Sequence, residues 1–326
     1  MTAHPLRPAR RTALAAAACA ALALAAPPAA NEARAAEFVN VLTGGTSGVY
    51  YPLGVGLSKI YADNIPDVRT QVQSTKASVE NLNLLQKGRG EIALALGDSV
   101  KLAWEGDEEA GFPAPLDKLR GIAAVYPNVV QIVASAESGV TDFAGLAGKS
   151  LSVGAPKSGT ELNARTIMAA ADMSYDDLGK TEYLPFAESV ELIKNRQLDA
   201  TLQSAGLGVA SIKDLATSIE ITMVSIPEDV VAKLEAPYVP ATIPAGTYDG
   251  QDEDVPTVAI KNFLVTHDEV SEELAYQMTK QLFEHLPELE AAHQAAREIS
   301  LEGALEGMPL PLHPGAERYY REQGLM

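Results

Sequence analysis

Cysteine is almost absent from this chain of 326 residues, and its absence limits redox and metal chemistry. The single thiol, Cys19, lies in an N-terminal block rich in alanine and leucine that we expect to be removed. Without it the mature chain can form neither a disulfide nor a thiolate metal site. Lipid modification of Cys19 is the alternative, but the apolar block continues to Ala26, beyond the position where a lipoprotein would be cut.

Long hydrophobic runs are also missing. The apolar block Ala13 to Ala26 has about fourteen residues, fewer than the roughly twenty that a spanning helix requires. It follows Arg7, Arg10 and Arg11 and precedes a small-x-small site at residues 33–35. This is the pattern of a secretory signal peptide. We therefore expect residues 1–35 to be cleaved near Ala35 and the mature protein to be periplasmic. The Arg10-Arg11 pair leaves the twin-arginine export route open beside the general one.

Positive charge is scarce as well. The chain has 25 Lys and Arg against 43 Asp and Glu, a net charge of −18. Loss of residues 1–35 removes four arginines and one glutamate and brings the net charge to about −21. Nucleic acid, whose phosphates require a basic face, is therefore not an expected partner. A small anionic ligand is not excluded, because helix N-termini act at contact distance.

The residues that usually carry catalysis are few. The sequence has no G-x-S-x-G motif and no thiolate to pair with a histidine, so no hydrolase nucleophile is visible. No i, i+4 pair that could bind a metal occurs among the four histidines of the mature chain, His267, His285, His293 and His313. We expect no enzymatic activity, no metal and no cofactor.

Strand-like and helix-like segments alternate along the mature chain, which predicts an α/β fold with mainly parallel sheets. The expected strands are 91–96, 121–125, 131–134, 150–154, 199–203, 219–224 and 258–265, and the expected helices include 53–61, 79–87, 160–171 and a long one at 271–296. About 290 residues exceed the usual size of one core and indicate two domains. Candidate crossings are Tyr126-Pro127-Asn128 and the proline-rich stretch 237–248, so we assign residues 36–127 and 242–326 to lobe I and residues 128–241 to lobe II.

Two glycine- and hydroxyl-rich loops stand between a predicted strand and a predicted helix. The first is residues 44–52, and the second, residues 154–163, repeats the design about a hundred residues later. Such a loop directs backbone N–H groups at whatever lies in front of it, which suits an anion. The first loop matches neither a P-loop nor the dinucleotide fingerprint G-x-G-x-x-G. Ligands of open α/β sheets bind at the carboxyl ends of strands, so we expect one ligand to be held from both lobes.

The candidate ligand-binding residues come from these and neighbouring strand ends: Thr46, Ser47, Gly48, Tyr50, Ser78, Asn81, Asp98, Ser158, Gly159, Thr160, Asn163, Gln203, Ser204 and Gly206. Hydroxyls and the Gly48 N–H can hold a carboxylate. Ser78 and Asn81 also fit a plain helix-capping arrangement, and Asp98 fits a helix N-cap or an acceptor for a ligand ammonium group. Arg165 lies four residues after Glu161 and is interpreted as its salt-bridge partner rather than as a carboxylate clamp. Trp104, the only tryptophan, is interpreted as core.

Five ordered motifs resemble the TAXI branch of the extracytoplasmic solute receptors that serve TRAP transporters. They are Gly45-Thr46-Ser47-Gly48-x-Tyr50-Tyr51-Pro52-Leu53-Gly54, Ser78-Val79-Glu80-Asn81-Leu82, Val153-Gly154-Ala155-Pro156-x-Ser158-Gly159-Thr160-Glu161-x-Asn163-Ala164-Arg165, Pro240-Ala241-Thr242-Ile243-Pro244-Ala245-Gly246-Thr247-Tyr248 and Pro311-Leu312-His313-Pro314-Gly315-Ala316-Glu317-Arg318-Tyr319-Tyr320.

This resemblance implies a two-lobed periplasmic-binding-protein (Venus flytrap) fold, each lobe a mainly parallel sheet flanked by helices. It also implies a monomeric receptor that closes over a small carboxylate, such as glutamate, glutamine, 2-oxoglutarate or a related dicarboxylate. The receptor would deliver the ligand to the TRAP membrane permease subunits, which an ion gradient drives. The alternatives are the binding protein of an ABC importer and a ligand-sensing module of the same fold.

Overall fold

The computed structural model describes residues 37–326. The predicted signal peptide and its cleavage site lie outside the described residues. Within residues 37–326, no helix combines the length and apolar character needed to cross a bilayer.

The strands of residues 37–326 join into one sheet of ten strands, in the order β2-β1-β3-β10-β4-β7-β5-β6, with β8 beside β4 and β9 beside β10. Their bounds are β1 Glu37–Leu42, β2 Val68–Gln73, β3 Ile92–Leu96, β4 Leu119–Ser135, β5 Ser150–Ser152, β6 Lys180–Glu182, β7 Ala200–Ala205, β8 Ile221–Val224, β9 Val239–Ile243 and β10 Val255–His267. Strand β1 runs parallel to β2 and β3, and β5 runs parallel to β6 and β7. The long strands β4 and β10 are antiparallel to each other and to their other neighbours.

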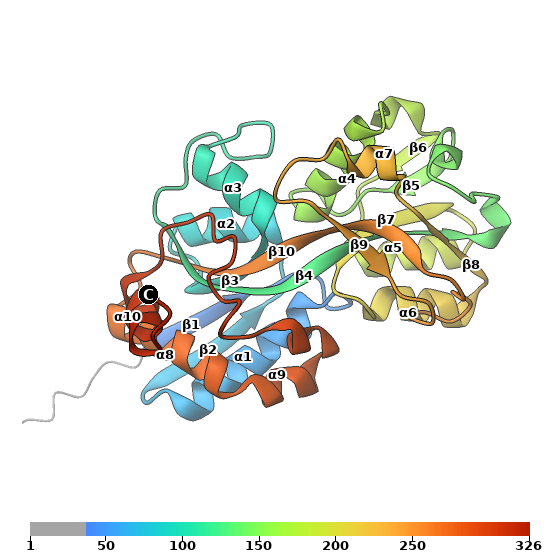
Figure 1. The fold of residues 1–326 in the computed structure, drawn as a ribbon. Helices are drawn as coiled ribbons and strands as arrows, with labels where there is room; N and C mark the ends of the chain where they lie inside the picture. The colour runs from blue at the N-terminus through green and yellow to red at the C-terminus, as the bar shows by residue number, and fades with distance from the viewer. Residues whose placement is uncertain (1–36) are drawn as a thin grey trace, which may run out of the picture. The chain divides into compact units, whose positions relative to one another are not determined.

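Helices cover this sheet in two groups (Figure 1). Their bounds are α1 Tyr50–Asn64, α2 Ser78–Gln86, α3 Gly97–Glu105, α4 Gly159–Ala170, α5 Phe186–Lys194, α6 Ala210–Ser218, α7 Glu228–Val231, α8 Glu272–Glu284, α9 Leu286–Ala292 and α10 Pro314–Glu322. We call β1–β3 with α1–α3 and α8–α10 lobe I, and β5–β8 with α4–α7 lobe II. Strands β4 and β10 run from one lobe into the other.

The apolar core falls into three clusters. The largest fills lobe I between its strands and α1, α8 and α10 and extends under α5 and α6. A second packs α4 against β4 and β7 in lobe II, and a third lies under α2 and α3. Trp104 is half-buried against this third cluster, at the edge of the core. Each lobe therefore has apolar packing that supports its own strand ends.

Two predicted elements differ from the structure. Residues 121–125 and 131–134 are not separate strands joined at Tyr126-Pro127-Asn128, because β4 continues through all of them. A register shift against β10 lies beside Pro127 and accommodates the missing N–H of the proline. The predicted lobe boundaries at residues 127/128 and 241/242 fall inside β4 and β9, and their exact position stays a prediction.

The predicted long helix 271–296 is also interrupted. It ends as α8 at Glu284, and α9 starts at Leu286 with Pro287 in its first turn. A proline is accepted in a first turn but breaks the interior of a helix, because it lacks an N–H and its ring collides with the preceding turn.

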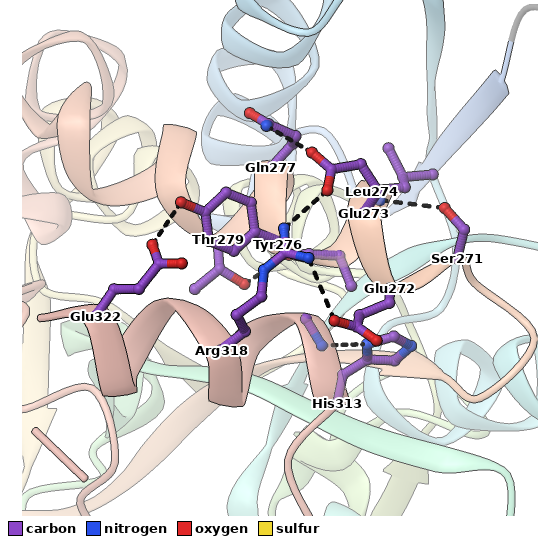
Figure 2. Close-up of polar contacts among 12 residues, drawn as sticks. Ser271, Glu272, Glu273, Leu274, Tyr276, Gln277, Thr279, His313, Arg318 and Glu322 are labelled. Atoms are coloured by element: carbon purple, nitrogen blue, oxygen red, sulfur yellow. Dashed lines mark hydrogen bonds and ion pairs between the residues drawn. The ribbon is translucent and has the colours of Figure 1, made fainter. Parts of the chain in front are cut away.

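The C-terminal helix α10 is held against α8 (Figure 2). The Arg318 guanidinium lies 3.9 Å from the centroid of the Tyr276 ring and donates to Glu272 and Glu273. Gly315 allows the close approach, since a Cβ there would lie 2.1 Å from the Glu272 carbonyl oxygen. The end of the chain thus braces lobe I on a face that the cavity described below does not reach.

Candidate ligand-binding site

A cavity of about 340 Å³ lies at the junction of the two lobes. Its wall is made by Gly44, Gly45, Thr46, Ser47, Gly48, Val49, Tyr50, Ser74, Thr75, Lys76, Ala77, Ser78, Leu96, Tyr126, Asn128, Ala155, Ser158, Gly159, Thr160, Pro185, Phe186, Ala187, Glu188, Ser204 and Ala205. A volume of this size falls in the range of small-molecule sites.

Strand ends and helix starts build this wall. Four of the lining segments follow the carboxyl ends of β1, β2, β5 and β6. The other lining residues lie at the ends of β3 and β7 and in the middle of β4. Four helices, α1, α2, α4 and α5, begin at the wall. The first-turn N–H groups of a helix have no partner within it, and each N-terminus carries about half a positive charge. The cavity is therefore suited to an anion.

Nine of the predicted site residues line the cavity: Thr46, Ser47, Gly48, Tyr50, Ser78, Ser158, Gly159, Thr160 and Ser204. The structure brings the two hydroxyl-rich loops together across it, although they are about a hundred residues apart in sequence. Asn81, Asp98, Asn163, Gln203 and Gly206 do not line it. Ligand contact by any of the fourteen stays a prediction.

The loop after β2 is pinned by Asn81. The Asn81 amide donates to the carbonyls of Thr43, at 2.7 Å, and Leu94, at 2.9 Å, and its oxygen accepts from the Thr75 hydroxyl. Ser78 is the first residue of α2, and its hydroxyl accepts from the Leu96 N–H at 3.1 Å instead of capping its own helix. Both residues thus fix the positions of lining segments, beyond the capping that the sequence suggests.

A buried chain of polar groups runs behind the wall. Tyr50 donates to the Asn262 side chain on β10, which in turn donates to Asn128 at 2.8 Å. Asn128 donates to the Ser204 carbonyl at 2.9 Å. Burial raises the pKa of Tyr50 well above its usual value, so its hydroxyl stays protonated and can donate.

Asp98 and Asn163 meet beside the cavity. Asp98, in the first turn of α3, is 5% exposed and accepts from Asn163 and from Tyr238. Burial raises the pKa of Asp98, and hydrogen bonds from Tyr238, Ser99 and Asn163 oppose that rise. With its oxygens used in this way, Asp98 is a contact between α3 and α4 in this structure.

Gln203 and Gly206 lie behind the lining of β7. Successive side chains of a strand point to opposite faces. Ser204 accordingly lines the cavity, while Gln203 points the other way and accepts from the Ser211 hydroxyl of α6 at 2.6 Å. A Cβ at Gly206 would lie 3.2 Å from the Tyr126 ring, so this glycine makes room for a lining aromatic.

Charged side chains stand only at the exposed rim of the lining. Lys76 from lobe I and Glu188 from lobe II are the two charged residues of the wall, and both are exposed. Arg165 is not part of the wall; it forms the predicted ion pair with Glu161, with N···O at 2.8 Å. Inside, attraction for an anion must therefore come mainly from N–H groups and hydroxyls.

Two hydroxyl groups at the wall have no protein partner. The Tyr126 hydroxyl is buried and makes no hydrogen bond within residues 37–326. Thr160 is 6% exposed, its methyl group lies against Gly154, and no hydrogen bond of its hydroxyl occurs in the described part of the chain. The Thr160 hydroxyl is therefore free to bond to a ligand, whereas the Tyr126 hydroxyl is enclosed by protein atoms and is not exposed to the cavity.

Strained backbone flanks the wall. Ala77 has φ 71° and ψ −144° immediately before α2, and Lys157 has φ 63° immediately before the Ser158 cap of α4. Residues other than glycine rarely adopt positive φ, and such strain is concentrated at ligand clamps and active sites. These two segments also touch, because the Glu80 N–H donates to the Lys157 carbonyl at 3.2 Å.

Several lining residues were not among the predicted set. Tyr126 and Asn128 alternate along β4, and the sequence signal was the polar interruption of an apolar run, which we interpreted as a domain crossing. Residues 74–77 lead into the predicted Ser78, and Ser74 and Thr75 repeat the hydroxyl-rich design of the first loop, so the same reasoning could have found them. Phe186 follows a short strand and had no comparable signal.

Within residues 37–326, no group of three or more His, Cys, Asp or Glu side chains could hold a metal ion. The residues that line the cavity include no histidine, cysteine or aspartate. The functional chemistry of this wall is hydrogen bonding by N–H groups, hydroxyls and amides.

Comparisons with known proteins agree with this geometry. A family model described as the NMT1-like family matches residues 41–324. Among solved structures, the periplasmic binding protein BugD aligns with a TM-score of 0.57 at 12% identity, over 89% of this chain and 94% of its own. The alkanesulfonate-binding protein SsuA from Xanthomonas axonopodis pv. citri, bound to MOPS, aligns with a TM-score of 0.50 at 14% identity, over 90% and 95%.

A putative L-cystine ABC transporter protein from Listeria monocytogenes aligns with a TM-score of 0.50 at 13% identity, over 82% of this chain and 98% of its own. At these identities the similarity concerns the fold. The predicted two-lobed α/β fold of periplasmic binding proteins is confirmed.

Proposed function

The chain belongs to the NMT1-like family, and we propose that it is an extracytoplasmic solute-binding protein that closes around a small organic anion and delivers it to a membrane importer. The observation that carries this proposal is the cavity between the lobes, at whose wall four helices begin and where the Thr160 hydroxyl has no partner within residues 37–326. The ligand is a small carboxylate or an anion of similar size, held by N–H groups and hydroxyls instead of by an arginine.

We interpret this wall as one that binds a ligand without catalysing a reaction. Its polar residues can hold an anion, but they include no nucleophile paired with a base. Closure is then an equilibrium that the ligand shifts by contacts available only when both lobes surround it. The importer would recognise the closed form.

An ABC importer is the partner that we favour. Two proteins with this fold are a putative L-cystine ABC transporter protein and an alkanesulfonate-binding protein. A TRAP permease is the second candidate, and the five motifs that resemble the TAXI branch support it. Uptake of a bound solute by cells distinguishes the two, because ABC transport stops when ATP is depleted and TRAP transport stops when the ion gradient is dissipated.

A thermal-shift screen of the refolded mature protein tests ligand binding. The panel contains glutamate, glutamine, 2-oxoglutarate, C4 to C6 dicarboxylates, an alkanesulfonate, L-cystine and neutral sugars. A ligand at a hundred times its Kd adds about 2.7 kcal/mol, which raises the melting temperature of a chain of this size by about 4 °C. A shift with one anion supports the proposal. A shift with neutral sugars alone contradicts the assignment of an anion site.

A further inference from the structure

A buried carboxylate ties the two lobes together outside the cavity lining. The Asp98 side chain accepts from the Ser99 N–H at 2.6 Å, from the Tyr238 hydroxyl at 2.9 Å and from the Asn163 amide. Within residues 37–326, no lysine or arginine side chain pairs with it. A buried carboxylate is costly unless its oxygens are hydrogen-bonded, so these donors, together with the Ser99 hydroxyl at 3.4 Å, decide whether this arrangement is stable.

The partners of Asp98 come from different parts of the fold. Asp98 starts α3 in lobe I, Asn163 lies on α4 in lobe II, and Tyr238 precedes β9. The start of α4 lies directly against lobe I here, because a Cβ at Gly159 would be 2.6 Å from Leu96. The Asp98–Asn163 contact therefore requires α4 to be packed against lobe I.

Asn163 also connects this contact to the cavity. Its amide nitrogen donates to Asp98 and, at 3.0 Å, to the Tyr238 hydroxyl, and its oxygen accepts from the Ser204 hydroxyl at 2.6 Å. Ser204 is 5% exposed and lines the cavity. The orientation of the Asn163 amide is thus set at one end by a lobe I carboxylate, and it sets the direction of a lining hydroxyl at the other.

We propose that Asp98 and Asn163 are positioning residues for ligand binding: Asp98 orients Asn163 and, through it, the Ser204 hydroxyl, and their contact holds the lobes closed. The proposal rests on the proposed function in that closure serves to bind a ligand. It assigns Asp98 a role other than contact with a ligand ammonium group, because the carboxylate is outside the lining and its oxygens already accept from protein donors.

A reciprocal exchange of the two residues tests this arrangement. In Asn163→Asp two carboxylates face each other, and in Asp98→Asn one acceptor oxygen becomes a donor that faces other donors. The double variant Asp98→Asn/Asn163→Asp restores complementarity: an amide at 98 donates to a carboxylate at 163, which also accepts from Ser204.

The mature chain has no cysteine of its own, so spin labels can be attached selectively at cysteines that are introduced. The distance between the labels then measures closure without a ligand. Spin labels on Lys101→Cys in α3 and Lys233→Cys after α7 report the distance between the lobes; both positions are exposed. We expect Asn163→Asp to shift the ligand-free protein to longer distances and to weaken binding of the tightest anion in the screening panel at least about tenfold. Asp98→Asn should change both quantities in the same direction. The affinity of the double variant should return to within about threefold of the parent's affinity.

The control is Asp107→Asn, which makes the same chemical change at a carboxylate that accepts from the Ala110 N–H within lobe I. It should change neither distance nor affinity. Melting curves of every variant identify any that fails to fold. The proposal would be overturned if both single variants kept the parent's distances between the lobes. It would also be overturned if the double variant recovered neither the distance nor the affinity lost in Asn163→Asp. If no member of the panel binds the parent protein, the anion proposal fails, and the spin-label distances still decide the role of Asp98.

Discussion

A single methyl group at Gly159 should hold the lobes apart. Gly159 is the first residue of α4, and a Cβ there would lie 2.6 Å from Leu96 Cδ1, 2.8 Å from Ser78 Oγ and 2.9 Å from Ser99 Oγ. All three neighbours belong to lobe I. Gly159→Ala therefore collides only when α4 is packed against lobe I, and lobe II by itself should fold normally, because alanine is a better helix former than glycine.

The size of the effect follows from this geometry. Contacts below 3.0 Å must be relieved by movement, and overpacking of this kind costs about 1–3 kcal/mol. If that cost falls on the closed form alone, closure and ligand affinity weaken by about fivefold to about 150-fold. The melting temperature of the ligand-free protein changes little to the extent that the lobes can separate and relieve the contact.

Calorimetric titration with the tightest anion of the screening panel measures the affinity, and the spin labels on α3 and after α7 measure the lobe distance. Gly145→Ala is the matched control, since a Cβ there meets its nearest neighbour, Asp142 Oδ1, at an ordinary 3.4 Å. If Gly159→Ala binds as tightly as the parent, or loses its stability and its affinity together, the idea that this contact belongs to the closed form alone is refuted.

Three further predictions concern the site and its supports. Thr46→Ala combined with Thr160→Ala should weaken anion binding at least about tenfold with an unchanged melting temperature, since both hydroxyls belong to the wall; unchanged affinity in titration removes them from the site. Asn81→Ala removes the hydrogen bonds to the Thr43 and Leu94 carbonyls, costs about 2–3 kcal/mol and should lower the melting temperature by about 4 °C; a smaller effect than in a half-buried Asn83→Ala control contradicts this support role. Burial lowers the pKa of His313, so the folded state favours the neutral ring. This contribution to stability is present above the ordinary histidine pKa of about 6.5 and is lost as pH falls through the lowered value. The free energy of unfolding, measured in urea at pH 7 and pH 5, should therefore decrease less in His313→Asn than in the parent.

Local patterns predicted the segments that build the site. The alternation of apolar strands and amphipathic helices predicted the α/β fold, because strand and helix periodicities can be recognised within ten residues. Glycine and hydroxyl residues between strand and helix predicted the loops at Thr46 and Thr160, since such loops must expose N–H groups. The break of the long helix at Pro287 was also visible in the sequence, although we had expected a continuous helix.

The sequence by itself thus determined which segments become strands, helices and polar loops, because those preferences depend on neighbouring residues. Only the tertiary structure decided which of these segments meet. It placed Tyr126 and Asn128 in the wall by extending β4 through Pro127, and it joined Asp98 to Asn163 across 65 positions of the chain. Whether a polar side chain faces a cavity, a helix cap or the opposite lobe depends on packing between distant segments, and no local pattern encodes it.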